Sequence, residues 1–118
     1  MAKEENKTHY FAIVNEWFAF QSQNKNVKPM HATLYLYIVN KFNQLFWKDS
    51  IGLPTDFTME LLNIGSYNTF KKTINDLIEF GFIKELCKGE NQFKARIIAL
   101  SFFDESLDKS LSNHCQIT

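Results

Sequence analysis

The sequence of this chain predicts a mainly helical fold with one small β-hairpin, which places it in the α+β class. The first observation behind this prediction is that, in four stretches before Gly81, apolar side chains recur every three or four positions, the period of a helix. The second is that this period changes after Gly81. There, two apolar stretches flank a polar tip at residues 88–92, which is typical of two strands joined by a turn.

The first predicted helix carries apolar residues from Tyr10 to Phe20, after a polar start over residues 1–7. Its apolar surface is wider than the single stripe of a surface helix. One face is expected to point toward the core: Phe11, Val14 and Phe18. The other apolar residues lie off that face: Tyr10, Trp17 and Phe20. Two explanations of this second surface stay open, namely coverage by the rest of the core and a dimer interface.

The second predicted helix begins at Pro29, whose missing backbone N–H is not needed in the first helical turn. Apolar residues follow at helical spacing over residues 31–46. Residues 49–55 contain Gly52 and Pro54 around two apolar side chains. This pattern predicts a turn with a very short edge strand.

A short helix is predicted over residues 56–64, and Gly65 is expected to end it in the left-handed conformation. The Ser66 hydroxyl is then placed to cap a longer helix over residues 67–80, which Gly81 ends. Four apolar residues of the longer helix are expected to point inward: Phe70, Ile74, Leu77 and Ile78.

Residues 56–100 therefore contain, in order, a short helix, a tight turn, a longer helix and a hairpin. This order is that of a winged helix-turn-helix, with the hairpin at 82–100 as the wing. The domain is expected to span residues 8–103, and the polar residues 104–118 to form a tail or linker. With 12 Phe, 4 Tyr and 2 Trp in 118 residues, the sequence predicts one well-filled core.

Charge is balanced overall, with 13 Lys plus Arg against 13 Asp plus Glu, and so gives no general sign of a nucleic-acid partner. Its distribution is uneven. Residues 66–96 contain six basic and four acidic side chains, whereas the chain from residue 97 onward contains one basic and three acidic ones. This asymmetry of charge is mild and does not by itself indicate a nucleic-acid partner.

The charged start of the chain lacks the apolar segment of a secretion signal, and no run approaches the roughly 18 apolar residues of a membrane span. Cys87 and Cys115 have neither the spacing of a disulfide framework nor that of a metal site. The sequence therefore predicts a cytoplasmic protein with reduced thiols and no membrane partner.

The N-terminal turns of the helix at 67–80 carry polar side chains suited to DNA. Asn can pair with an adenine edge, and Lys can reach guanine or phosphate in the major groove. The DNA contacts predicted on the helix and just before it are Ser66, Tyr67, Asn68, Thr69, Lys71, Lys72 and Asn75. Those predicted on the wing are Lys88, Asn91, Lys94 and Arg96. A solvated helix face without a function has a similar composition, so that interpretation stays open.

No catalytic constellation is recognisable. His9, His31 and His114 are scattered, and the sequence contains no Gly-rich phosphate loop. We therefore expect no enzyme activity, no metal and no cofactor.

The junction Phe80-Gly81-Phe82-Ile83-Lys84, with Leu61-Leu62-Asn63-Ile64-Gly65-Ser66 before it, resembles the N-terminal winged-helix domains of phage-type and DnaD-like replication-initiation proteins. The resemblance covers roughly residues 8–103 and includes the lead-in at 31–37, followed by Asn43 and Trp47. It implies a domain that binds DNA, most readily duplex, and self-associates as a homodimer. It also implies replication initiation of a phage or mobile element as the process, and replication proteins as further partners.

Two main hypotheses of function follow. In the first, the helix at 67–80 enters the major groove and the hairpin contacts the backbone. In the second, the domain is a protein-interaction or dimerisation scaffold that uses the surface of Tyr10, Trp17 and Phe20 and binds no DNA. A transcriptional regulator is a third possibility.

Overall fold

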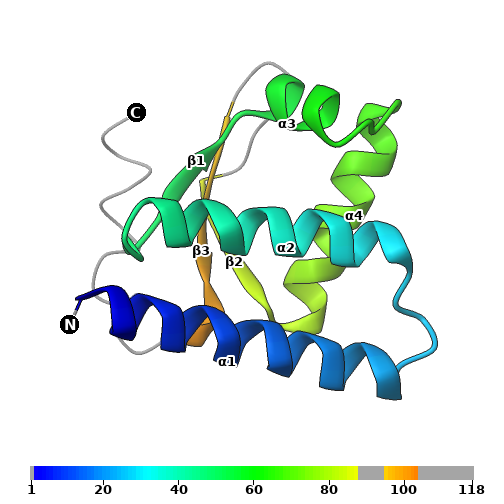
Figure 1. The fold of residues 1–118 in the computed structure, drawn as a ribbon. Helices are drawn as coiled ribbons and strands as arrows, with labels where there is room; N and C mark the ends of the chain where they lie inside the picture. Colours follow the sequence, from blue (N-terminus) through cyan, green and yellow to red (C-terminus); the bar gives the residue numbers. More distant parts are fainter. Residues whose placement is uncertain (1, 88–94, 104–118) are drawn as a thin grey trace. The chain divides into compact units, whose positions relative to one another are not determined.

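The computed structural model describes the backbone of residues 2–87 and 95–103 (Figure 1). These residues form four α-helices and a three-stranded antiparallel sheet, so the predicted α+β class is confirmed. The chain divides into two compact units, residues 1–48 and residues 49–118, which are described separately. None of the described helices is long and apolar enough to cross a membrane.

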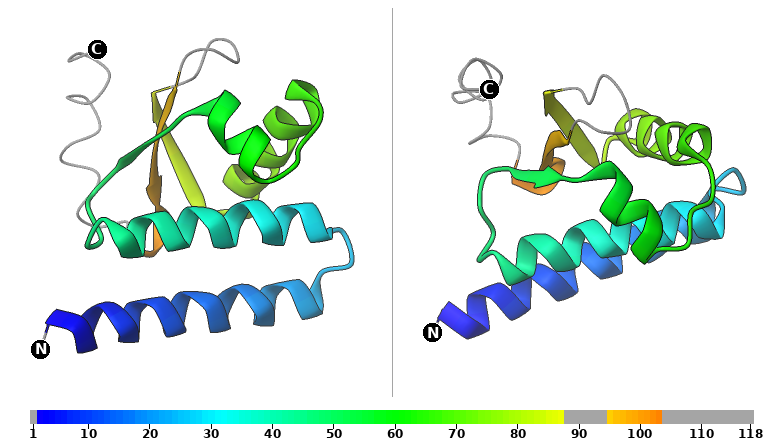
Figure 2. Two further views of the ribbon diagram at one scale, coloured as in Figure 1. Left: turned by 45° about the horizontal axis from the view of Figure 1, so that its top comes forward. Right: turned by 90° about the horizontal axis from the view of Figure 1, so that it is seen from above.

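The first unit is a pair of helices, α1 (Ala2–Gln23) and α2 (Pro29–Gln44), joined by a short loop. The two helices lie side by side in both views of Figure 2. The Trp17 and Tyr35 rings pack against each other, with their centroids 4.8 Å apart. The α2 helix begins at Pro29 as predicted, whereas α1 begins at Ala2 and so includes the polar start of the chain.

The inward face predicted for α1 is wrong. Trp17 is fully buried and Ile13 is 1% exposed, whereas Phe11 and Phe18, which were expected inside, are 53% and 50% exposed. Tyr10 and Phe20 are half-buried. The physical reason is that α1 carries apolar residues on every side, and Trp17, the largest of them, gains most from burial.

The α2 helix ends in two hydrogen bonds that turn the chain sharply. The N–H of Trp47 donates to the carbonyl of Phe42 at 2.8 Å, and the N–H of Phe46 donates to that of Asn43 at 3.2 Å. This pair of bonds is the Schellman motif, which requires a left-handed residue just after the helix. Here that residue is Phe46, with φ 58°, and Trp47 after it also has φ 58°.

The second unit contains the sheet and two helices. Its strand order is β1-β3-β2, with both neighbouring pairs antiparallel, so β1 is the predicted short edge strand. The hairpin pairs Ile83 with Leu100 and Glu85 with Ile98, with an irregularity between Glu85 and Cys87. The elements are β1 (Ile51–Leu53), α3 (Thr55–Leu61), α4 (Tyr67–Phe80), β2 (Ile83–Cys87), β3 (Arg96–Leu100) and a 3₁₀ turn (Ser101–Phe103).

Both helices of the second unit also end in Schellman motifs. The N–H of Ile64 donates to Met59 at 2.8 Å after α3, and the N–H of Phe82 donates to Leu77 at 3.1 Å after α4. Gly81, which was predicted to end this helix, has φ 91°. After α3, however, the left-handed residue is Asn63, with φ 60°, and not Gly65. Asn tolerates this conformation because its short polar side chain fits it better than a bulkier one does.

The α4 helix packs against β2. Its buried residues are Phe70, Thr73, Ile74 and Leu77, and Ile78 is half-buried.

Cys87, at the end of β2, is disulfide-bonded, so the prediction of a reduced thiol is wrong there. The second cysteine, Cys115, lies outside the described residues, as does the tail predicted at 104–118.

Candidate nucleic-acid interface

Ser66 sets the start of α4. Its backbone is extended, with φ −135° and ψ 132°, and its hydroxyl oxygen accepts a hydrogen bond from the N–H of Thr69 at 3.4 Å. The predicted cap is therefore confirmed. The first turn of α4 contains no acidic residue, so no carboxylate there opposes an anion at this positive end of the helix dipole.

The predicted reading face of α4 lies on the surface. Phe70, Ile74 and Leu77 anchor the inner side of the helix, and Thr73 also turns inward, donating its hydroxyl to the carbonyl of Thr69 at 2.8 Å. Tyr67 is half-buried. The other predicted contact residues of α4 and its cap are all exposed: Ser66, Asn68, Thr69, Lys71, Lys72 and Asn75.

The two lysines of this face differ electrostatically. Lys72 pairs with Asp76 one turn along, at 3.2 Å between Nζ and Oδ2, and its side chain remains 74% exposed. An exposed pair of this kind is weak, so a phosphate could displace Asp76 at little cost. Lys71 makes no ion pair with any described residue and carries the uncompensated charge of the face.

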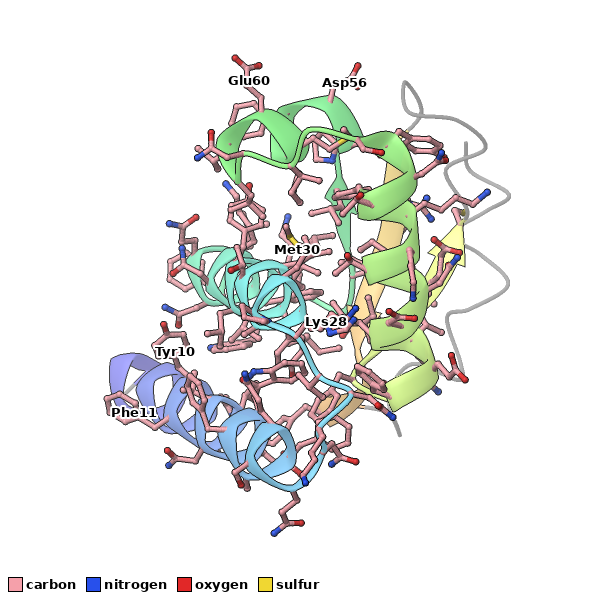
Figure 3. All side chains as sticks on the ribbon, turned by 90° about the vertical axis from the view of Figure 1, so that its right-hand side faces the viewer. Tyr10, Phe11, Lys28, Met30, Asp56 and Glu60 are labelled. Carbon is pink, nitrogen blue, oxygen red and sulfur yellow. The ribbon has the colours of Figure 1, made fainter. Side chains whose placement is uncertain are left out.

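The outer side of α3 carries acidic residues. Asp56 and Glu60 are exposed and lie one turn apart, and Figure 3 shows both projecting outward from the helix. Carboxylates repel phosphate. The outer side of α3 is therefore unfavourable to DNA.

Arg96, predicted as a wing contact, does not lie at the surface. It is 2% exposed, its guanidinium pairs with the Glu85 carboxylate, and it lies 5.9 Å from the centre of the Phe70 ring. The reason is the two-residue period of a strand, which places Arg96 on the same face as the buried Ile98 and Leu100. We therefore exclude Arg96 from the candidate interface.

The pairing of Arg96 with Glu85 was missed by sequence reasoning, although a signal for it exists. A basic residue two positions before Ile98 falls on the inward face of β3 and requires a buried acid nearby. The other predicted wing contacts, Lys88, Asn91 and Lys94, lie outside the described residues.

Trp17, one of three residues predicted at a dimer interface, is fully buried and packs against Tyr35. Tyr10 and Phe20 are half-buried on the same helix. The aromatic side chains that α1 exposes in the described part of the chain are instead Phe11 and Phe18.

The described residues contain no cluster of three or more His, Cys, Asp or Glu that could hold a metal ion. Comparison with known protein families, with curated proteins and with solved structures finds no match for this chain. Its function must therefore be argued from the site itself.

Proposed function

We propose that this chain is a DNA-binding module of the winged helix-turn-helix type, in which α4 enters the major groove of duplex DNA. The observation that carries the proposal is the exposed, polar N-terminal half of α4. It presents Asn68, Lys71 and Asn75 on one side of a helix whose other side is anchored in the core. The order α3, turn, α4, β2 and β3 supports the same interpretation.

The few positive charges of the interface predict weak binding. Lys71 and Lys72 are the basic side chains of the described face, and each phosphate that they neutralise contributes roughly 0.9 to the slope of log affinity against log salt. Binding by a single module is therefore expected in the micromolar range and to fall steeply with salt. The sequence resemblance makes replication initiation of a phage or mobile element the process in which we place this activity. A cytoplasmic location is part of the proposal, and the disulfide of Cys87 would be unusual in that compartment.

The test is fluorescence anisotropy of the full chain with random-sequence duplex DNA at two salt concentrations. We expect the triple variant Lys71→Ala, Lys72→Ala, Asn75→Ala to lose most of the affinity and to reduce the salt slope by about 2. A matched control is Lys25→Ala with Lys48→Ala. This variant removes the same two charges from exposed loop positions of the first unit.

Two outcomes would contradict the assignment. Equal losses in the triple variant and in the control would mean that binding follows net charge and not the α4 face. Full affinity in the triple variant, with its helix content confirmed by circular dichroism, would mean that DNA binds elsewhere.

The second hypothesis, a protein-interaction scaffold, is favoured by a different observation. On α3, Phe57 and Leu61 are 56% and 52% exposed and lie one turn apart beside Asp56 and Glu60. Such a mixed apolar and acidic surface fits a basic protein partner better than DNA. No DNA binding by the wild-type chain at low salt would favour this hypothesis.

A further inference from the structure

Two asparagines occupy the outer side of α4. An α-helix has about 3.6 residues per turn, so each residue is rotated by about 100° from the one before it. The buried residues of α4 define its inner direction. This rotation places Asn68 and Asn75 on the opposite side of the helix, and both are exposed. Because they are seven positions apart, they lie about two turns from each other along the same side.

Neither asparagine has a structural role in the described part of the chain. Other asparagines do: the side-chain amide of Asn24 donates to the carbonyl of Phe20 at 2.8 Å, and Asn63 takes the left-handed position after α3. The side chains of Asn68 and Asn75 form no hydrogen bond with any described residue. Asparagine is a poor residue for a helix interior, so Asn75 weakens α4 and gains no bond in return. Both amides are therefore available to a ligand.

The charged residues around the two asparagines limit which part of α4 suits DNA. Lys71 lies between them in the sequence and makes no ion pair with a described residue. Glu79 is exposed one turn after Asn75 and places a carboxylate toward the C-terminal end of the outer side. Because a carboxylate repels phosphate, the first two turns of α4 are the part that suits a major groove. This part contains both asparagines.

We propose that Asn68 and Asn75 determine the DNA sequence that this chain prefers, each by pairing with one adenine in the major groove; the inference rests on the proposed function. In each pair the amide nitrogen donates to N7 of the base, and the amide oxygen accepts from its N6 amino group. Lysines, by contrast, contact phosphates without selecting a sequence. In this arrangement Lys71 and Lys72 supply affinity and the two asparagines supply specificity.

The spacing of the two asparagines predicts the spacing of the two adenines. Seven residues of helix extend roughly 10.5 Å along the helix axis. Base pairs are stacked roughly 3.4 Å apart, so a helix that runs along the groove covers about three base-pair steps over this length. The preferred site is therefore expected to contain two A·T pairs three steps apart.

Fluorescence anisotropy of the full chain with a series of duplexes tests the proposal. The duplexes have equal length and carry two A·T pairs at different spacings in a G·C background. We expect the duplex with a spacing of three steps to bind best, about tenfold more tightly than the duplex without A·T pairs. Replacing its adenines by 7-deazaadenine, which pairs with thymine but lacks the N7 acceptor, should remove this preference.

Single variants separate base contacts from phosphate contacts. Asn68→Ala and Asn75→Ala should each lose the preference at one of the two A·T pairs and keep the salt slope, because neither variant removes a charge. Lys71→Ala should keep the preference and lower the salt slope by about 1. Asn26→Ala removes an exposed loop asparagine of the first unit, so it is the matched control and should behave like the wild type. Circular dichroism confirms that each variant is folded.

The outcomes distinguish this inference from the proposed function. Equal affinity of the wild type for every duplex would overturn the reading of bases and leave DNA binding by α4 in place. A best spacing other than three steps, a preference that survives 7-deazaadenine, or an asparagine variant that keeps the full preference would also overturn the reading of bases. No binding of the wild type to any duplex at low salt would overturn both proposals.

Discussion

At the residue scale, Phe46 is the position where backbone and side chain conflict most clearly. The described α2, α3 and α4 all end in Schellman motifs, whose left-handed residues are Phe46, Asn63 and Gly81. Glycine takes this conformation freely and Asn tolerates it, whereas a bulky residue is strained there. Phe46 is also 79% exposed, so burial of its ring does little to offset that strain.

We therefore expect Phe46→Gly to be more stable than Phe46→Ala by about 1 kcal/mol, since both variants lose the ring and differ in the left-handed penalty. Urea denaturation followed by tryptophan fluorescence measures this difference. The reciprocal variant is Gly81→Ala, whose added Cβ would meet no atom within 4 Å. The free energy of unfolding of this variant should fall by about 1 kcal/mol, because only the backbone conformation at position 81 is penalised. An alanine at position 46 as stable as glycine would refute the strain.

The ion pair of Arg96 and Glu85 gives a second prediction at this scale. Their side chains are 3% and 9% exposed, so removing one partner leaves a charge nearly buried and unpaired. Arg96→Met alone should destabilise the fold by about 3 kcal/mol, and the double variant Arg96→Met, Glu85→Leu should recover most of this loss. A double-mutant cycle in urea measures the coupling. If the folded double variant also lost DNA binding, the exclusion of Arg96 from the interface would be wrong.

At the element scale, two substitutions of Ser66 are expected to change the stability of α4 and its proposed DNA binding independently. Ser66→Ala should cost about 1 kcal/mol of stability, because the N–H of Thr69 loses its side-chain acceptor. Ser66→Asp keeps an acceptor at the cap and a negative charge that favours the helix dipole, so stability should be retained. The same carboxylate would repel phosphate at the end of α4 that is proposed to meet DNA.

The measurement is thermal unfolding and duplex-DNA anisotropy on the same two variants. We expect Ser66→Ala to be less stable with DNA binding largely kept, and Ser66→Asp to be stable with DNA binding reduced several-fold. Unimpaired binding by Ser66→Asp would place the DNA away from this end of the helix.

The same elements show what the sequence could and could not predict. Three local features were predicted correctly, because each depends on backbone chemistry. They are the start of α2 at Pro29, the cap of α4 at Ser66 and the end of α4 at Gly81. The inner face of α1 was not, because its apolar residues surround the helix and tertiary contact selects among them. The exposed side of α4 was predictable because its two sides differ so strongly in polarity.

At the scale of the whole molecule, the sequence was a weaker guide. The domain over residues 8–103 stays a prediction, and the division of the chain at residue 48 into two compact units was not foreseen from the sequence. The boundary lies just after the strained turn at Phe46 and Trp47. No composition shift or linker-like segment marks it, since apolar residues continue on both sides. The partner of Arg96 was likewise hidden, because it depends on the register of a hairpin that contains an irregularity.

Alkaline pH provides a test of the folded molecule as a whole. Burial raises the pKa of Tyr35 well above its ordinary value of about 10, and the Glu16 carboxylate adds to that rise. Above about pH 10 the unfolded chain therefore loses this phenolic proton while the folded chain keeps it. The free energy of unfolding should hold its full Tyr35 contribution below about pH 10 and decrease as the pH rises beyond it.

Urea denaturation at pH 8, 10 and 11 measures the decrease, which should be smaller in Tyr35→Phe than in the wild type. Tyr37→Phe, which removes a phenol from a half-buried position on the same helix, controls for the loss of a hydroxyl group. An equally steep decrease in Tyr35→Phe would show that groups other than this buried phenol, the lysines among them, govern alkaline unfolding.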